Sequence, residues 1–112
     1  MNNKDIYVTF KDDKLEAIFE SLEKGKFEDK TLYNSINKVI GKLKTNPECG
    51  IKIPQKLWPK IYIQHHNINN LWKYNLPKGW RLLYTIKIEE IRIINVILEW
   101  LPHKEYEKRF KY

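Results

Sequence analysis

The sequence predicts an α+β fold, in which an N-terminal strand and two helices pack on one face of a mostly antiparallel four-stranded sheet, followed by a short C-terminal tail or helix. Residues 6–10 alternate with the period of a strand, and residues 14–44 carry two apolar stripes at helical spacing. Residues 71–100 contain three segments rich in β-branched and aromatic residues. A length of 112 residues fits one compact domain, so residues 1–112 are expected to form a single domain.

The N-terminal part predicts one strand and two helices in succession. Asp12 and Asp13 end the strand and offer a helix cap. The first helix ends at Gly25 and has the apolar stripe Leu15, Ile18, Phe19 and Leu22. The second helix covers residues 31–44, ends at Asn46-Pro47 and has the apolar stripe Leu32, Ile36, Val39, Ile40 and Leu43. The charges between these positions indicate a solvated face, so both helices are expected to serve packing.

The C-terminal half predicts a β-meander with strands over residues 71–76, 80–88 and 91–100. In the last strand, alternation places Arg92, Ile94, Val96, Leu98 and Trp100 on one face. This face is apolar except for Arg92. The two helices are expected to cover this apolar side and to leave the opposite face of the sheet open. Pro54 and Pro59 break any long element, so residues 50–70 are expected to form an ordered loop.

Composition excludes several classes of site. No apolar stretch approaches the ~20 residues of a membrane span, and no signal peptide is expected, so the predicted location is the cytoplasm. Cys49 is the only cysteine, which rules out an internal disulfide and a thiolate-rich zinc site. His65-His66 has no third His or Cys at ligand spacing, and cations surround it. Neither a metal nor any other cofactor is expected.

Charge is distributed unevenly along the chain. The net charge is +7, and residues 1–50 hold nine Lys against nine Asp and Glu, so the second half carries all of it. Residues 51–88 contain no acidic side chain, and their basic residues are Lys52, Lys56, Lys60, Lys73, Lys78, Arg81 and Lys87. Six aromatic residues lie among these cations. Such a pattern is typical of a site for a polyanion, and the aromatics favour single-stranded nucleic acid. The alternative is a sheet with a basic face and an aromatic core.

Two motifs resemble those of a known family. Residues 71–84 (LWKYNLPKGWRLLY) combine a basic residue on a strand with a Gly-aromatic-Arg-aliphatic-aliphatic-Tyr signature. Residues 102–106 (PHKEY) combine His, a basic residue, an acidic residue and Tyr. Together with the order of elements, these motifs resemble the RelE/ParE toxin superfamily of type II toxin–antitoxin systems, most closely its RelE-like members.

The resemblance implies a ribosome-dependent mRNA endonuclease, or mRNA interferase, that cuts messenger RNA in the ribosomal A site. The family reaction needs no metal, because the ribose 2′-hydroxyl attacks the adjacent phosphate. The implied partners are the mRNA and a cognate antitoxin protein that masks the basic face. ParE-like members share the fold and act on DNA gyrase.

The resemblance also implies roles for individual residues. Arg81 matches the arginine that stabilises the phosphate, and Lys73 matches a strand lysine. Lys104 matches the C-terminal basic residue, and Tyr106 the tyrosine. His103 is the better acid or base, since histidine has an unperturbed pKa of about 6.5. The expected catalytic residues are therefore Lys73, Arg81, His103, Lys104 and Tyr106, and the expected nucleic-acid contacts are Lys52, Lys56, Lys60, Lys73, Lys78 and Arg81.

Other readings of the motifs remain open. Asn75 stands where some family members have a second strand lysine. Lys78 can substitute for that lysine only if the Lys78 side chain points to the same face of the sheet. Tyr106 follows Lys104 by two residues, closer than the family tyrosine. A non-catalytic member that binds only RNA or antitoxin, a ParE-like gyrase inhibitor and an inhibitor that reuses the fold are therefore alternatives. Plain packing or surface roles are the alternatives for Lys73, Arg81 and Tyr106.

Overall fold

A five-stranded mixed sheet forms the centre of the protein. The computed structural model describes residues 4–110, so residues 1–3 of the predicted domain and residues 111–112 of the predicted tail lie outside the described residues. The strands are β1 (Asp5–Phe10), β2 (Ile51–Lys52), β3 (Trp72–Asn75), β4 (Arg81–Ile88) and β5 (Arg92–Leu101), in the order β1-β5-β4-β3-β2. β1 runs parallel to β5, and the other pairs are antiparallel. The α+β class is confirmed, with the two-residue β2 as a fifth strand.

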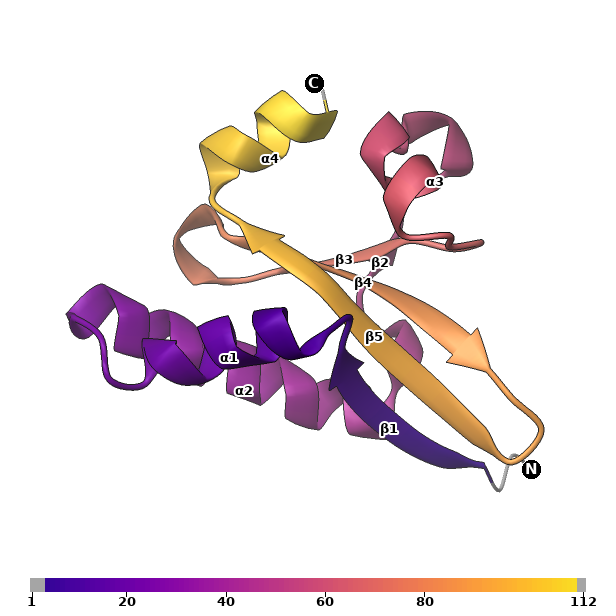
Figure 1. Cartoon of the computed structure of the whole chain (residues 1–112), viewed down its shortest axis with the longest axis horizontal. Helices are drawn as coiled ribbons and strands as arrows, with labels where there is room; N and C mark the ends of the chain where they lie inside the picture. Colours follow the sequence, from indigo (N-terminus) through magenta and orange to yellow (C-terminus); the bar gives the residue numbers. More distant parts are fainter. Residues whose placement is uncertain (1–3, 111–112) are drawn as a thin grey trace.

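Helices lie on both faces of this sheet. The α-helices are α1 (Asp13–Leu22), α2 (Phe27–Thr45), α3 (Lys60–His65) and α4 (His103–Phe110). Short 3-10 helices are η1 (Pro47–Cys49), η2 (Gln55–Leu57) and η3 (Pro77–Gly79). Figure 1 shows α1 and α2 on one side of the sheet and α3 and α4 on the other. Residues 50–70 therefore contain β2, η2 and α3, and the predicted tail is a helix over its described residues.

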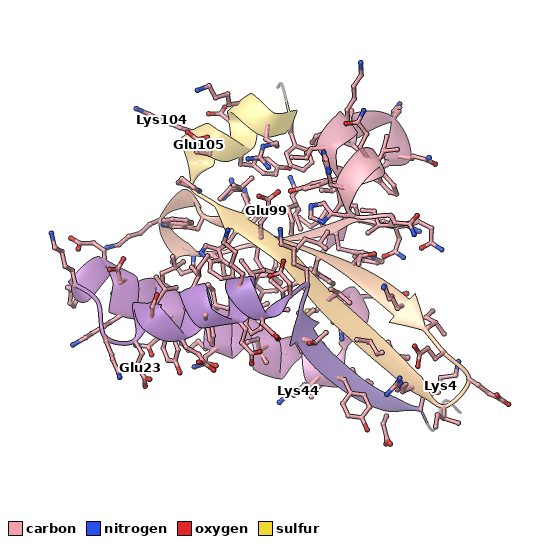
Figure 2. The ribbon with its side chains drawn as sticks, viewed as in Figure 1. Lys4, Glu23, Lys44, Glu99, Lys104 and Glu105 are labelled. Atoms are coloured by element: carbon pink, nitrogen blue, oxygen red, sulfur yellow. The ribbon has the colours of Figure 1, made fainter. Side chains whose placement is uncertain are left out.

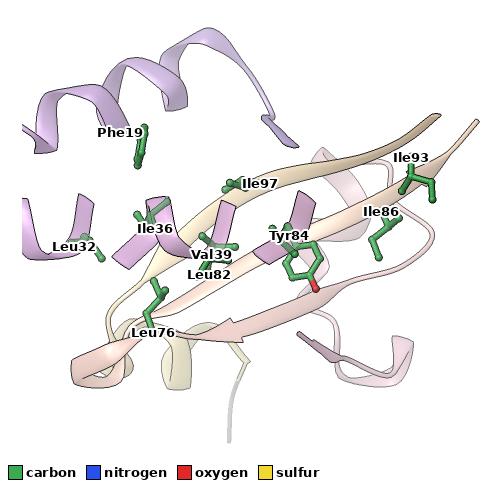
Figure 3. Close-up of a cluster of buried hydrophobic side chains, with 11 residues drawn as sticks. Phe19, Leu32, Ile36, Val39, Leu76, Leu82, Tyr84, Ile86, Ile93 and Ile97 are labelled. Atoms are coloured by element: carbon green, nitrogen blue, oxygen red, sulfur yellow. The ribbon is translucent and has the colours of Figure 1, made fainter. Parts of the chain in front are cut away.

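The larger core lies between the sheet and the helices α1 and α2 (Figure 3). Its buried members are Phe19, Leu32, Ile36, Val39, Leu43, Leu76, Leu82, Tyr84, Ile86, Ile93 and Ile97. Asp12 caps α1 as predicted, because its Oδ1 accepts a hydrogen bond from the Leu15 N–H at 2.8 Å. The Asp29 carboxylate accepts from the Lys26 N–H at 3.3 Å, which starts α2 at Phe27 rather than at residue 31.

In β5, the side chains that face α1 and α2 are not the ones that the sequence pattern predicts. Ile93, Asn95 and Ile97 are the buried residues on that face, not Ile94 and Val96. The buried Asn95 amide donates to the Tyr7 carbonyl at 3.1 Å and to the Leu43 carbonyl at 3.4 Å. These hydrogen bonds satisfy the amide nitrogen and offset part of the cost of burying this side chain, whereas the Asn95 Oδ1 is buried without a partner among the described residues.

A β-bulge in β5 changes which face the following residues occupy. Leu83 pairs with Glu99 and Tyr84 pairs with Ile97, so Leu98 is an extra residue on β5. Leu98 belongs to the core on the α3 and α4 side, and Glu99 pairs with Leu83 of the same core. The predicted alternation therefore holds through Leu98, which shares the face of Val96, and is wrong from Glu99 onward.

The second face of the sheet is covered where α3 and α4 pack on it, which corrects the prediction of an open face. The buried residues of this second core are Ile53, Tyr62, Leu71, Leu83, Leu98, Leu101, Tyr106 and Phe110. Tyr106 and Phe110 stand one helical turn apart on α4, and their rings stack with centroids 4.5 Å apart. The amphipathic α4 thus supplies the apolar cover that the predicted tail lacked.

The Tyr84 hydroxyl joins the sheet to the segment that follows α2. It donates to the Pro47 carbonyl at 2.8 Å and accepts from the Gly50 N–H at 3.1 Å, and its side chain is fully buried. Tyr84→Phe leaves both backbone groups without this partner, and we expect it to lower the free energy of unfolding by about 1–3 kcal/mol. Urea unfolding measures the loss. Tyr7→Phe, on an exposed ring, is the matched control, and equal stability of the two variants would contradict the assignment.

Candidate functional site

Three of the five predicted catalytic residues meet beneath α4. Lys73 and Arg81 lie on the α3 and α4 face, because their sheet partners Leu83 and Leu101 belong to the second core. The Lys73 Nζ is 5.1 Å from the centroid of the Tyr106 ring, and the Arg81 guanidinium carbon is 5.7 Å from it. Two cations from neighbouring strands therefore converge on one aromatic ring.

Arg81 keeps a hydrogen-bond donor unused. One of its terminal nitrogens donates to the Trp80 carbonyl at 3.2 Å. Its Nε is buried, and no acceptor for it exists among residues 4–110. A buried donor without a partner costs about 1–3 kcal/mol. The terminal nitrogens of the same guanidinium carry further donors and the positive charge that a phosphate oxygen requires.

His103 and Lys104 occupy the first turn of α4 and are exposed. His103 Nε2 lies 3.0 Å from the Glu107 carboxylate one turn further along. Figure 2 shows Lys104 projecting away from the sheet. The turn between β3 and β4 holds this end of α4 close, since a Cβ on Gly79 (φ +81°) would come within 3.0 Å of the His103 Cβ. His103 therefore lies beside the β3–β4 turn at Gly79, which is two residues from Arg81 in the chain, whereas Lys104 points outward from α4.

Glu99 is a central residue of this face that the sequence analysis did not identify. Arg109 of α4 donates to its carboxylate at 2.9 and 3.1 Å, and the Tyr62 hydroxyl of α3 donates to the same group. Figure 2 shows Glu99 on β5 between the sheet and α4. Burial, and then the negative charge of Glu99, raise the pKa of Tyr62, so its hydroxyl remains a donor. Glu99 thus joins both helices to the sheet.

A basic groove of about 590 Å³ runs between η2, α3 and α4. It contains the predicted Lys56 and Lys60 together with Lys108 and Arg109, which no motif had singled out. Glu105 is the single carboxylate among its described lining residues, and Trp58 and Phe110 add aromatic surface. A groove with excess positive charge and aromatic side chains can follow the backbone of a single-stranded nucleic acid.

Lys52 and Lys78 lie elsewhere. The Lys52 Nζ is 5.9 Å from the ring of Trp72, which packs against the core under α1 and α2. Lys78 has φ +60° and lines a small cleft of about 90 Å³ beside α2. The six predicted nucleic-acid contacts are therefore divided between the two faces of the sheet, and Lys78 is not beside Lys73 as a second strand lysine would be.

Residues 4–110 hold no cluster of three His, Cys, Asp or Glu side chains that could bind a metal ion. In the same range, no helix is long and apolar enough to cross a membrane. Comparisons with protein-family models, curated proteins and solved structures found no match to this chain. The functional argument therefore depends on the geometry of the site and on the sequence motifs.

Glu99 gives a direct test of how α3 and α4 are held. Glu99→Ala removes the acceptor of Tyr62 and Arg109, and we expect it to lower the free energy of unfolding by about 1–3 kcal/mol. Amide hydrogen exchange should accelerate in α3 and α4, with α1 and α2 unchanged. Glu105→Ala, on the exposed side of α4, is the control. Unchanged exchange in α4 of Glu99→Ala would show that apolar packing alone holds the helix.

Proposed function

We propose that this protein is a toxin-like endoribonuclease that cleaves mRNA in the ribosome without a metal. The observation that supports it best is the convergence of Lys73 and Arg81 on the Tyr106 ring. The RelE-like motifs of the sequence include the same residues. The proposed place of action is the cytoplasm, where ribosomes and mRNA are found.

Cleavage by the ribose 2′-hydroxyl makes specific demands on the protein. The hydroxyl oxygen forms a bond to the adjacent phosphorus, the bond to the 5′ oxygen breaks, and the transition state carries two negative charges. Fixed cations at its non-bridging oxygens lower the barrier. In this proposal Arg81 donates to one of these oxygens and Lys73 stabilises the same charge from the neighbouring strand. The Tyr106 ring positions both cations.

Proton transfer is assigned to the exposed start of α4. One group must accept the proton of the 2′-hydroxyl, and another must protonate the leaving 5′ oxygen. His103 and Lys104 are exposed in the first turn of α4 and accessible to RNA, whereas Tyr106 is only 2% exposed. We therefore assign the acid and base roles to His103 and Lys104. An acidic antitoxin would mask the basic groove between α3 and α4 in the resting cell.

A second candidate is an RNA-binding member of the same fold without nuclease activity. The burial of Tyr106 favours it, because its hydroxyl lies under α4 rather than in solvent. The pairing of His103 with Glu107 also favours it, since the imidazole already has a partner. Such a protein would block translation by occupying its target, and the variants below separate the two functions.

Arg81→Ala is the decisive variant for cleavage. Loss of one charged donor to the transition state typically costs ~3–4 kcal/mol, so we expect cleavage to fall about 10²–10³-fold. The rate is measured as mRNA cleavage in a reconstituted translation reaction. Arg92→Ala, which removes an exposed arginine paired with Glu89 at the far end of β5, is the control. Wild-type cleavage by Arg81→Ala would exclude the proposed mechanism, and inhibition of translation with intact mRNA would favour the second candidate.

The pH dependence of cleavage tests His103. If it transfers a proton, His103→Ala should remove one limb of the pH–rate profile, because the titrating group is lost. Lys108→Ala, on the same helix, is the control and should keep the profile. A His103→Ala profile that keeps its shape and is only scaled down would reduce His103 to a positioning role.

A further inference from the structure

A second cationic cleft lies between α2 and β3, on the opposite face of the sheet from Lys73 and Arg81. It has a volume of about 440 Å³, and its polar lining residues are Ser35, Lys38, Lys42, Tyr74 and Asn75. Each of these side chains can donate a hydrogen bond. No carboxylate occurs among its described lining residues, so the cleft has two positive charges and no internal counter-ion.

Lys42 and Tyr74 form a preorganised pair of donors. The Lys42 Nζ donates to the Tyr74 hydroxyl at 2.9 Å and lies 5.6 Å from the centroid of the same ring. An ammonium group only donates, so the tyrosine oxygen must accept, and its own proton needs another acceptor. Within residues 4–110 the Tyr74 hydroxyl has no such acceptor. Both the ammonium and the hydroxyl can therefore donate to one anion.

The neighbouring side chains indicate what kind of anion fits. Trp72 and Tyr74 are two residues apart on β3, so they share a face and lie about 6.6 Å apart along the strand. Each ring has a lysine beside it, Lys52 at 5.9 Å and Lys42 at 5.6 Å. Both rings are half-buried against the larger core, so their exposed parts and the two lysines repeat an aromatic group and a cation along the strand. Single-stranded RNA repeats a base and a phosphate, whereas an isolated phosphate or an acidic peptide would leave the rings unused.

We propose that the α2–β3 cleft is a second phosphodiester-binding site for single-stranded RNA, in which Lys42 and Tyr74 donate to one phosphate group. Lys38 contributes charge at the same cleft, and Lys52 beside Trp72 contacts the adjacent part of the strand. Hydrogen bonding to Tyr74 raises the pKa of Lys42, so its charge is present at neutral pH. RNA as the ligand is taken from the proposed function, but the site does not require that the RNA is cleaved.

The test measures binding separately from cleavage. The probe is a fluorescein-labelled single-stranded 2′-O-methyl RNA of about twelve nucleotides, a length that can span a groove. It lacks the attacking hydroxyl and stays intact, and its binding to the full chain is followed by fluorescence anisotropy at several salt concentrations. The variants are Lys42→Ala and Tyr74→Phe, with Lys44→Ala as the control. Lys44 is exposed at the end of α2 and does not line the cleft (Figure 2).

Charged and neutral donors should have different effects. We expect Lys42→Ala to weaken binding about tenfold and to reduce the salt slope by about 0.7, the value for one phosphate contact on a single strand. Tyr74→Phe keeps the ring and the charge, so it should weaken binding about three- to tenfold with the salt slope unchanged. Lys44→Ala should stay within about twofold of wild type. Circular dichroism verifies that each variant is folded.

Two results would overturn the proposal. One is RNA affinity of Lys42→Ala and Tyr74→Phe equal to that of Lys44→Ala. The other is a polyglutamate peptide that binds in a Tyr74-dependent way while the RNA does not, which would assign the cleft to an acidic protein segment. The proposed function is tested separately, and it fails if the wild type leaves RNA with 2′-hydroxyls uncut on the ribosome. In that case, Tyr74-dependent binding of the 2′-O-methyl RNA would still support the α2–β3 site.

Discussion

One extra residue in β5 determines how both faces of the sheet are used. Because Leu98 is inserted between the pairs Tyr84–Ile97 and Leu83–Glu99, the strand changes face at this point. Trp100 then packs against Phe10 and Phe19 with ring centroids 6.3 and 6.4 Å apart. Leu98 and Leu101 join the other core, and Glu99 faces α3 and α4. A single strand thereby supplies apolar side chains to two cores and a carboxylate to the smaller one.

The position of Glu99 allows a cationic helix to pack on a cationic face. α4 carries Lys104, Lys108 and Arg109, and it covers strands that present Lys73 and Arg81. Repulsion between these charges opposes the packing of the helix. One terminal nitrogen of Arg109 donates to both oxygens of Glu99, and this ion pair offsets one of the charges. The stacked Tyr106 and Phe110 rings place a polarisable surface over the others. The face keeps its positive charge and remains folded.

The elements with a strong periodic pattern could be predicted from the sequence, and those that depend on long-range contacts could not. α1, α2 and the meander lie within a few residues of their predicted bounds. The register that pairs Lys73 with Leu83 and Arg81 with Asn75 follows from the hairpin, so the closeness of these two cations was also predictable. The bulge at Leu98 leaves no local signal, and Glu99, Tyr62 and Arg109 were missed for that reason.

Three other differences from the prediction have identifiable causes. Pro54 and Pro59 suggested a loop, yet Pro59 directly precedes α3, a position at which a helix tolerates proline. The spacing of Tyr106 and Phe110 did carry a signal for α4, because residues four apart share a helix face. The buried face of β5 was predicted wrongly because it contains Asn95. A polar side chain is recognised as a core residue only when its hydrogen-bond partners are known, here on β1 and α2.

The alternation of β3 divides the basic and aromatic residues of the chain into two surfaces. Lys73 faces α4, while Trp72 and Tyr74 face α2, where Lys52 and Lys42 lie beside them. β3 is next to the edge of the sheet, because only the two-residue β2 follows it in the strand order. Both surfaces therefore reach the same edge. A ligand that touches both must bend around this edge. Duplex DNA, with a persistence length of about 50 nm, resists so tight a bend, whereas a single strand does not. If the protein binds nucleic acid as proposed, this placement of charge on the two faces of the sheet favours a flexible single strand over a duplex.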